Sequence, residues 1–272
     1  MTAASADASL APHYRRLGSD GGVQLFESTI STASNWGTAI QHGSPPLALL
    51  TKAIEELYLD RPQLRVGRLL LDILGAVPVA PVRVRAWVQR PGARISLAVA
   101  EMCPADAPDR PVARVSAWLL ATGDTADVRT DRYTPLTEGV AVDSAHGWLG
   151  APGYLETVSW RNQATDPGAA AQAWMSPLVP LVDDEPTTPL QRLAQVVDSA
   201  NGIGAVLEPA DFAFMNTDTA VHLHRVPRGN DFGLRARASI GPDGIGVTTA
   251  EIFDRDGFIG TSAQTLLVQR TH

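Results

Sequence analysis

The sequence predicts an α+β fold built from two similar halves, each an antiparallel sheet wrapped around one central helix. Two observations lead to this prediction. Each half contains one helix with a single apolar stripe, followed by extended segments that turns separate. These elements recur in the same order and at similar spacing in the second half. With 272 residues, 44% of them apolar, the chain is long enough to build such a core.

The first helix is predicted over residues 45–57. Its apolar side chains repeat at helical spacing on one face, at Leu47, Leu50, Ile54 and Leu57. Two prolines stand at its start, where a missing backbone N–H costs least. An extended segment at 23–31 precedes this helix. Alternating or apolar runs after it predict strands at 64–74, 82–89, 94–102 and 112–120.

The second half repeats this order. A helix is predicted over residues 188–200, with its apolar stripe at Leu190, Leu193, Val197 and Ala200. A strand at 154–159 or at 171–175 precedes it. Strands are predicted after it at 212–225, 232–240, 246–253 and 258–269, with turn residues at 241–244 and 254–257.

The two halves can be aligned directly. RAWVQRPGARISLAVAEM, from Arg85, matches RARASIGPDGIGVTTAEI, from Arg235, and RVSAWLL at 114–120 matches GTSAQTL at 260–266. We therefore expect a flexible tail at 1–11, a first unit at 12–121, a connection at 122–153 and a second unit at 154–272. A sheet covered on one face by one helix is the hotdog arrangement, and two such units in tandem can pair edge to edge, which removes an exposed sheet edge.

Composition excludes several classes of function. The net charge of −7 gives no general reason to bind nucleic acid or an anionic membrane. The single cysteine, Cys103, cannot form a disulfide within the chain. No run approaches the roughly 18 apolar residues of a membrane span, and the first residues lack the features of a signal peptide. We expect a cytoplasmic protein.

Four segments, in this order, resemble the type II acyl-CoA thioesterases of the double-hotdog superfamily. They are HGSPPLALLTKAIEE after Trp36, VVDSANGIG at 196–204, TDTAVHLHR at 217–225 and GTSAQTLLV at 260–268. The resemblance implies a thioesterase of lipid metabolism that hydrolyses acyl-CoA without a cofactor. It also implies a catalytic set of an Asp, a hydroxyl or amide side chain, and a Gln. Asp198 and Gln264 match that set, and either Asn216 or Thr217 fills its middle position.

The chemistry of a thioesterase suits these side chains. Water must be oriented and deprotonated, and the oxyanion that forms must be stabilised. Asp198 lies at the rim of the apolar stripe of its helix and is the expected base. Gln264, with Asn216 or Thr217, would hold the water. A backbone N–H at the start of the first helix, of Gly43 or Ser44, would bind the oxyanion across the two halves.

Other residues carry competing interpretations. Glu55 is the repeat partner of Asp198 and is the alternative base, or else a surface residue. Trp118 is the repeat partner of Gln264, which favours one working site over two. His42 is expected to have a capping or packing role. His222 and His224 share a strand face, but without a third ligand nearby we expect no metal.

Two other functions stay open at this level. One is a non-catalytic protein that binds acyl-CoA or another acyl thioester. The other is a hotdog hydratase or dehydratase, although the Asp and His pair that it needs has no clean match. The sequence does not decide the acyl chain length or the pathway, and it leaves open whether copies assemble into a homo-oligomer.

Overall fold

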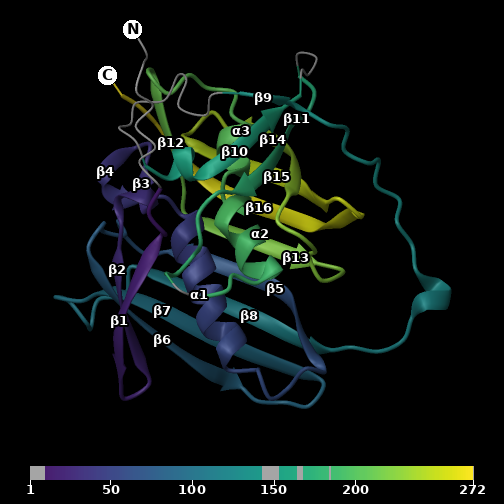
Figure 1. The fold of residues 1–272 in the computed structure, drawn as a ribbon. Coiled ribbons are helices and arrows are strands. Elements are labelled where there is room, and N and C mark those ends of the chain that lie inside the picture. Colours follow the sequence, from purple (N-terminus) through teal and green to yellow (C-terminus); the bar gives the residue numbers. More distant parts are fainter. Residues whose placement is uncertain (1–9, 143–152, 164–167, 184, 272) are drawn as a thin grey trace, which may run out of the picture.

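The computed structural model describes residues 10–142, 153–163, 168–183 and 185–271 (Figure 1). Residues 1–9 of the predicted tail and 143–152 of the predicted connection lie outside the described residues. The first half contains β1 (Tyr14–Asp20), β2 (Val23–Ser28), the 3₁₀ turn η1 (Ile30–Thr32), β3 (Ala33–Ser34), β4 (Gly37–Gln41), α1 (Ser44–Glu56), β5 (Leu64–Ile73), β6 (Pro81–Arg90), β7 (Ile95–Pro104) and β8 (Ala113–Ala121).

The second half begins after the short 3₁₀ turn η2 (Ala126–Val128). Its elements are β9 (Val140–Ala141), the 3₁₀ turn η3 (Tyr154–Thr157), β10 (Val158–Asn162), β11 (Ala171–Pro177), α2 (Pro189–Val197), α3 (Ala200–Ile203), β12 (Phe212–Asn216), β13 (Asp218–Leu223), β14 (Phe232–Ile240), β15 (Ile245–Asp254) and β16 (Gly257–Arg270). The helices α1 and α2 and most strands on their C-terminal side therefore lie close to their predicted positions, whereas α3 has no predicted counterpart.

Apart from β3 and β4, which form a small sheet of their own, the strands of both halves belong to one antiparallel sheet. Among the described residues its order is β1-β2-β6-β7-β8-β5-β13-β16-β15-β14-β11-β10-β9, with β12 paired to β16. The halves meet where β5 pairs with β13, in a register that places Leu69 opposite Val221. We predicted two sheets paired at their edges. The pairing of β5 with β13 makes them continuous because it satisfies the backbone groups that each half would otherwise expose.

Some strands differ from the sequence-based expectations. β1, which forms a hairpin with β2, and the small β3–β4 sheet have no predicted counterpart. Of the two candidate strands before α2, the segment 171–175 lies in β11, whereas 154–157 forms η3 and leads into β10. The predicted strand 212–225 is broken at Thr217. Both of its parts pair with the long β16, and the break lets β13 reach β5 as well.

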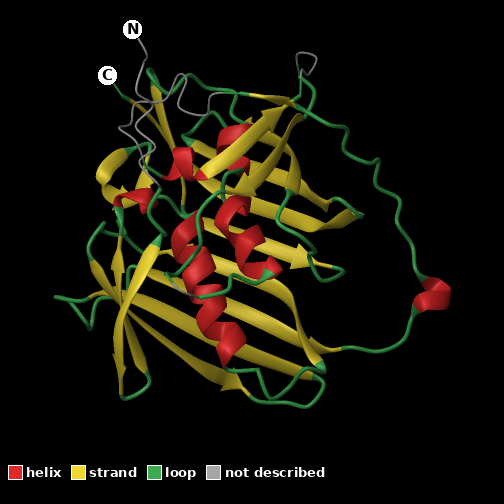
Figure 2. Cartoon of the chain, viewed as in Figure 1, coloured by secondary structure: helices red, strands yellow, loops and turns green. Residues whose placement is uncertain are grey.

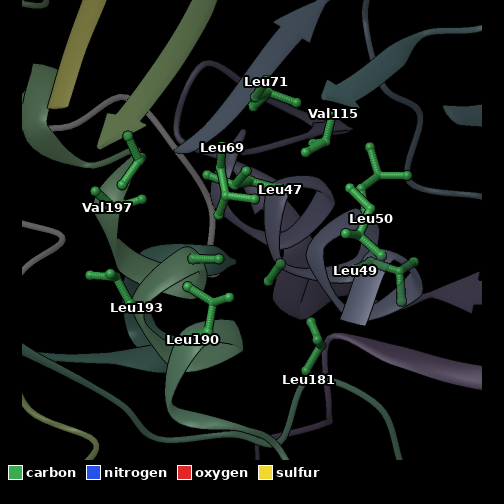
Figure 3. Packing of buried hydrophobic residues seen from close by; sticks show 14 of the residues in the cluster. Leu47, Leu49, Leu50, Leu69, Leu71, Val115, Leu181, Leu190, Leu193 and Val197 are labelled. Carbon is green, nitrogen blue, oxygen red and sulfur yellow. The ribbon is translucent and has the colours of Figure 1, made fainter. Parts of the chain in front are cut away.

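The two long helices lie side by side, with the sheet curved around them (Figure 2). They run in opposite directions, so that the C-terminal end of each contacts the N-terminal end of the other. Figure 3 shows the leucines and valines that fill the space between the helices and the sheet. The predicted stripes are buried, with Leu47, Leu50, Leu193 and Val197 no more than 1% exposed.

The first helix is enclosed on almost every side. All its residues from Ser44 to Ile54 are buried, including Lys52, whose ammonium pairs with Glu56 and Glu185. This burial follows from its position, because the sheet covers one side of α1 and α2 covers another (Figure 1). No helix in the described ranges is long and apolar enough to cross a membrane.

Candidate active site

Asp198 lies at the bend between α2 and α3. The helix α2 begins with a capping box, in which Thr188 Oγ1 accepts from the Gln191 N–H and Gln191 Oε1 accepts from the Thr188 N–H. It ends at Val197, and Asp198 is its C-cap. The side chain of Asp198 is only 3% exposed. Burial of a carboxylate is costly unless hydrogen bonds compensate it, so its partners decide what it can do.

One oxygen of this carboxylate is held by three side chains. Asn216 Nδ2 donates to Oδ1 at 2.8 Å and Gln264 Nε2 donates at 3.2 Å. The hydroxyl of Thr219 also donates to Oδ1. Gln264 Nε2 lies 2.9 Å from the backbone carbonyl oxygen of Asp198 as well. Hydrogen bonds to an ionised acceptor are among the stronger ones in proteins, and together they fix the orientation of the carboxyl plane.

These donors come from three neighbouring strands. Asn216 ends β12, Thr219 lies in β13, and Gln264 lies on β16 between the segments that pair with β12 and β13. The bend at Thr217 therefore gathers the three side chains on the inner face of the sheet. The structure brings together the predicted residues Asp198, Asn216 and Gln264.

Thr217 does not join this group. Its side chain is exposed, and its hydroxyl lies near Asp218 Oδ1 at 3.3 Å and the Thr265 carbonyl oxygen at 3.4 Å. Thr219 supplies the hydroxyl instead and is fully buried. Thr219 shares the buried face of β13 with the apolar Val221 and Leu223, but alternation alone does not separate it from Thr217, which stands two residues earlier.

The second oxygen of Asp198 faces the start of α1. A β-carbon built on Gly43 would lie 2.4 Å from Oδ2, so only glycine leaves room for the carboxylate there. Gly43 has ordinary helical dihedral angles, φ −67° and ψ −25°, so space rather than backbone conformation requires it. The site is thus assembled from both halves of the chain.

The backbone donors at the start of α1 are few. Pro45 and Pro46 have no N–H, and the Ser44 N–H donates to Nδ1 of His42 at 3.1 Å. Ser44 is therefore engaged away from the carboxylate. Among the described residues no hydrogen bond uses the Gly43 N–H, which leaves it as the donor that a ligand can meet.

His42 lies between Asp198 and Tyr154. Its Nδ1 is 3.7 Å from Asp198 Oδ2, and its ring stacks on Tyr154 with centroids 3.9 Å apart and planes 10° apart. These contacts agree with the expected capping or packing role. Burial lowers the pKa of His42, and the negative charge of Asp198 opposes this shift only in part.

A cavity of about 540 Å³ opens beside these groups. His42, Gly43, Asp198 and Asn216 line it, whereas Thr219 and Gln264 lie behind the carboxylate. Most of the remaining wall is apolar and comes from both halves, including Trp36, Ile40, Leu71, Ile73, Leu155 and Trp160. A polar group at the edge of an apolar cavity is the usual form of a small-molecule site.

Glu55, the alternative base, occupies the corresponding place at the other end of the helix pair. It accepts hydrogen bonds from Thr188 Oγ1 at 2.9 Å and from Gln191 Nε2 at 2.7 Å. Burial raises its pKa, and these donors oppose the shift. Side chains of the capping box therefore cover Glu55, whereas the glycine at the corresponding place beside Asp198 leaves space open, and Glu55 does not line the cavity.

Comparisons with known proteins agree with this architecture. A conserved hot-dog-fold protein of unknown function from Alicyclobacillus acidocaldarius superposes with a TM-score of 0.71 at 14% identity, over 92% of this chain and 94% of that one. An acyl-CoA thioesterase II from Mycobacterium marinum gives a TM-score of 0.64 at 15% identity, over 94% of each chain. These likenesses show a hotdog fold.

Sequence comparison gives the family. No curated protein sequence matches the chain. Two family profiles do match it, the acyl-CoA thioesterase N-terminal domain over residues 32–120 and the acyl-CoA thioesterase C-terminal domain over residues 135–268. The match to the N-terminal domain precedes the match to the C-terminal domain along the chain, as in the family. The chain therefore belongs to the acyl-CoA thioesterase family.

Proposed function

We propose that this protein hydrolyses acyl-CoA thioesters to a free acid and coenzyme A, with Asp198 as the general base. One observation carries the proposal. The carboxylate of Asp198 has one oxygen fixed by three donors, while the other lies at a cavity beside a helix start. This arrangement suits a general base, because the bonds to one oxygen keep a lone pair of the other oxygen pointing toward the cavity.

The reaction then follows from the positions of these groups. Water bound between Asp198 Oδ2 and the Asn216 amide attacks the acyl carbon, and Asp198 takes a proton from it. The carbonyl oxygen becomes an oxyanion that accepts from the Gly43 N–H, helped by the dipole of α1. Collapse of the tetrahedral intermediate breaks the C–S bond. The thiolate of coenzyme A leaves and takes up the proton from Asp198.

Gln264 and Thr219 act as positioning residues in this scheme. They lie behind the carboxylate and do not line the cavity, so they hold Asp198 rather than the water. Asn216 lines the cavity and can contact both the carboxylate and a ligand. This assignment replaces Thr217 by Thr219 and gives Asn216 the contact with water.

We further propose that the chain is a double hotdog with units at 12–121 and 154–272 and one working site. The contrast between the two helix ends supports this proposal. Asp198 faces Gly43 and a cavity, whereas Glu55 is covered by Thr188 and Gln191. The apolar wall of the cavity suits the acyl group of a thioester.

The test is release of free thiol from acyl-CoAs of short, medium and long chain. We expect turnover by the wild type and a loss of about 10²–10⁴-fold in kcat for Asp198→Asn, with an unchanged circular dichroism spectrum. Glu55→Gln is the matched control and should keep kcat. Binding of acyl-CoA without turnover would reject hydrolysis and favour an acyl-CoA-binding protein. Hydration of an enoyl-CoA without thiol release would favour a hydratase.

A further inference from the structure

The proposed hydrolysis leaves one group at the site without a chemical role. His42 lines the cavity together with Gly43 and Asp198. Its Nδ1 accepts the Ser44 N–H at 3.1 Å, which requires a lone pair on that nitrogen. In the neutral ring the proton is then on Nε2. Among the described residues no hydrogen bond uses Nε2, so this N–H is available to a ligand.

The ring is held in one orientation. It stacks on Tyr154 at 3.9 Å, and the Tyr154 hydroxyl donates to the Gln195 carbonyl oxygen at 2.8 Å. That hydroxyl also lies 2.9 Å from Ser199 Oγ, next to Asp198 in the chain. Tyr154 is fully buried, so the surface on which the imidazole rests does not move freely. A donor fixed in this way costs little reorganisation when it is used.

Burial keeps the imidazole neutral near pH 7. The titratable groups that face it are Asp198, His13 and Tyr154. Burial lowers the pKa of His42 more than the Asp198 carboxylate raises it, and His13 next to it is also held neutral by burial. Tyr154 stays protonated because burial raises its pKa well above the usual value. A neutral imidazole can donate from Nε2 without giving its proton to a thioester.

We propose that His42 is a catalytic residue of this hydrolysis, whose Nε2–H binds the thioester carbonyl oxygen together with the Gly43 N–H. The two donors are adjacent in the chain and border the same cavity as the proposed base. They would form a two-donor oxyanion site in which one donor is a side chain. The proton stays on Nε2 throughout, and negative charge on the oxygen strengthens the hydrogen bond. This inference rests on the proposed hydrolysis.

Two substitutions separate this role from simple capping of the helix. The amide nitrogen of Gln can reach the position of Nε2, whereas the amide oxygen of Asn can replace the acceptor Nδ1. We expect His42→Asn to lower kcat by about 10²–10³-fold, the usual effect of losing one oxyanion donor, with little change in KM. His42→Gln should retain kcat within about tenfold of the wild type, because it keeps a donor.

The reverse order, with His42→Asn active and His42→Gln impaired, would overturn the inference and leave His42 as a residue that only positions the helix start. Equal, unchanged kcat in both variants would overturn it as well. If the wild type itself releases no thiol, the proposed hydrolysis fails, and that result is distinct from either pattern in the variants.

A second measurement does not depend on turnover. An acyl-CoA ketone, in which a methylene replaces the sulfur, keeps the carbonyl and cannot be hydrolysed. Donors to that carbonyl lower its infrared stretching frequency. We expect a lowered frequency for the ¹³C-labelled ketone bound to the wild type and to His42→Gln, and a higher one with His42→Asn. The same frequency in all three proteins would exclude the Nε2 contact.

Discussion

A β-carbon added to Gly43 would lie 2.4 Å from Oδ2 of Asp198, so the start of the first helix and the buried carboxylate are in direct contact. The two residues belong to different halves of the chain. The contact explains why the site needs both halves. It also makes Gly43 a sensitive probe of the geometry.

Gly43→Ala should therefore impair the enzyme without disturbing the backbone. The dihedral angles of Gly43 suit alanine, but the carboxylate cannot move aside without weakening its bonds to Asn216, Thr219 and Gln264. We expect a loss of at least about tenfold in kcat and of about 1–3 kcal/mol in stability, by thiol-release kinetics and urea unfolding. Gly123→Ala, at an open position, should behave as the wild type.

The two threonines around Asp218 give a matched pair. Thr219→Val keeps the shape of a buried side chain but removes a donor to Asp198, so we expect kcat to fall about tenfold and stability to fall by about 1–3 kcal/mol. Thr217→Val changes an exposed side chain and should stay within about 0.5 kcal/mol of the wild type. Equal losses of activity in the two variants would contradict the placement of Thr219 at the site.

Glu55 should matter for stability and not for turnover. Its carboxylate accepts from the cap and the first turn of α2, so Glu55→Ala should lower the free energy of unfolding by about 0.5–2 kcal/mol. The value of kcat should not change, because Glu55 does not line the cavity. Thermal unfolding and thiol release measured on one preparation check both parts. A collapse of kcat in this variant would move the base to Glu55.

Acid should destabilise the protein through His13. Burial, with a smaller contribution from His42, lowers the pKa of His13 from 6.5 to about 3. Its nitrogens are engaged by Thr157 Oγ1 at 3.0 Å and by Gln195 Nε2 at 3.2 Å. The unfolded chain binds a proton near pH 6.5 and the folded protein does not until about pH 3. The free energy of unfolding should therefore fall by about 1.4 kcal/mol per pH unit on acidification between these values.

Urea unfolding from pH 7 to pH 4.5 measures this slope. His13→Gln removes the titrating group and should flatten the profile, although its stability at pH 7 should also be lower because two buried hydrogen bonds change. His222→Gln, on the exposed side of β13, should leave the slope as it is. A profile that His13→Gln does not change would assign the acid sensitivity to other groups.

Local patterns were sufficient to predict α1, α2 and most strands. The apolar stripes of α1 and α2 appear in the sequence at a period of 3.6 residues and are buried in the structure, although α1 is buried on its other faces as well. Most strands were predicted from alternation and from the turn residues between them. The repeat of these elements, with the residues around Asp198 and Gln264, also indicated the family that the sequence profiles show.

Contacts between distant segments could not be predicted in this way. Thr217 and Thr219 are residues of the same type, two positions apart. Only the break between β12 and β13 decides that Thr219 faces the carboxylate. The joining of both halves through β5 and β13 also depends on partners far away in the chain. Strand register fixes which side chains meet, and no local period encodes it.

The sequence by itself determined α1, α2, most strands and the tandem order, since these depend on residues close together in the chain, and its resemblance to a known family indicated the candidates Asp198 and Gln264. Only the tertiary structure decided that Gly43 lies against Asp198, that Thr219 and Asn216 hold its oxygen, and that Glu55 is covered by the capping box. The physical reason is that an antiparallel helix pair places the end of each helix beside the start of the other. That packing joins residues more than a hundred positions apart.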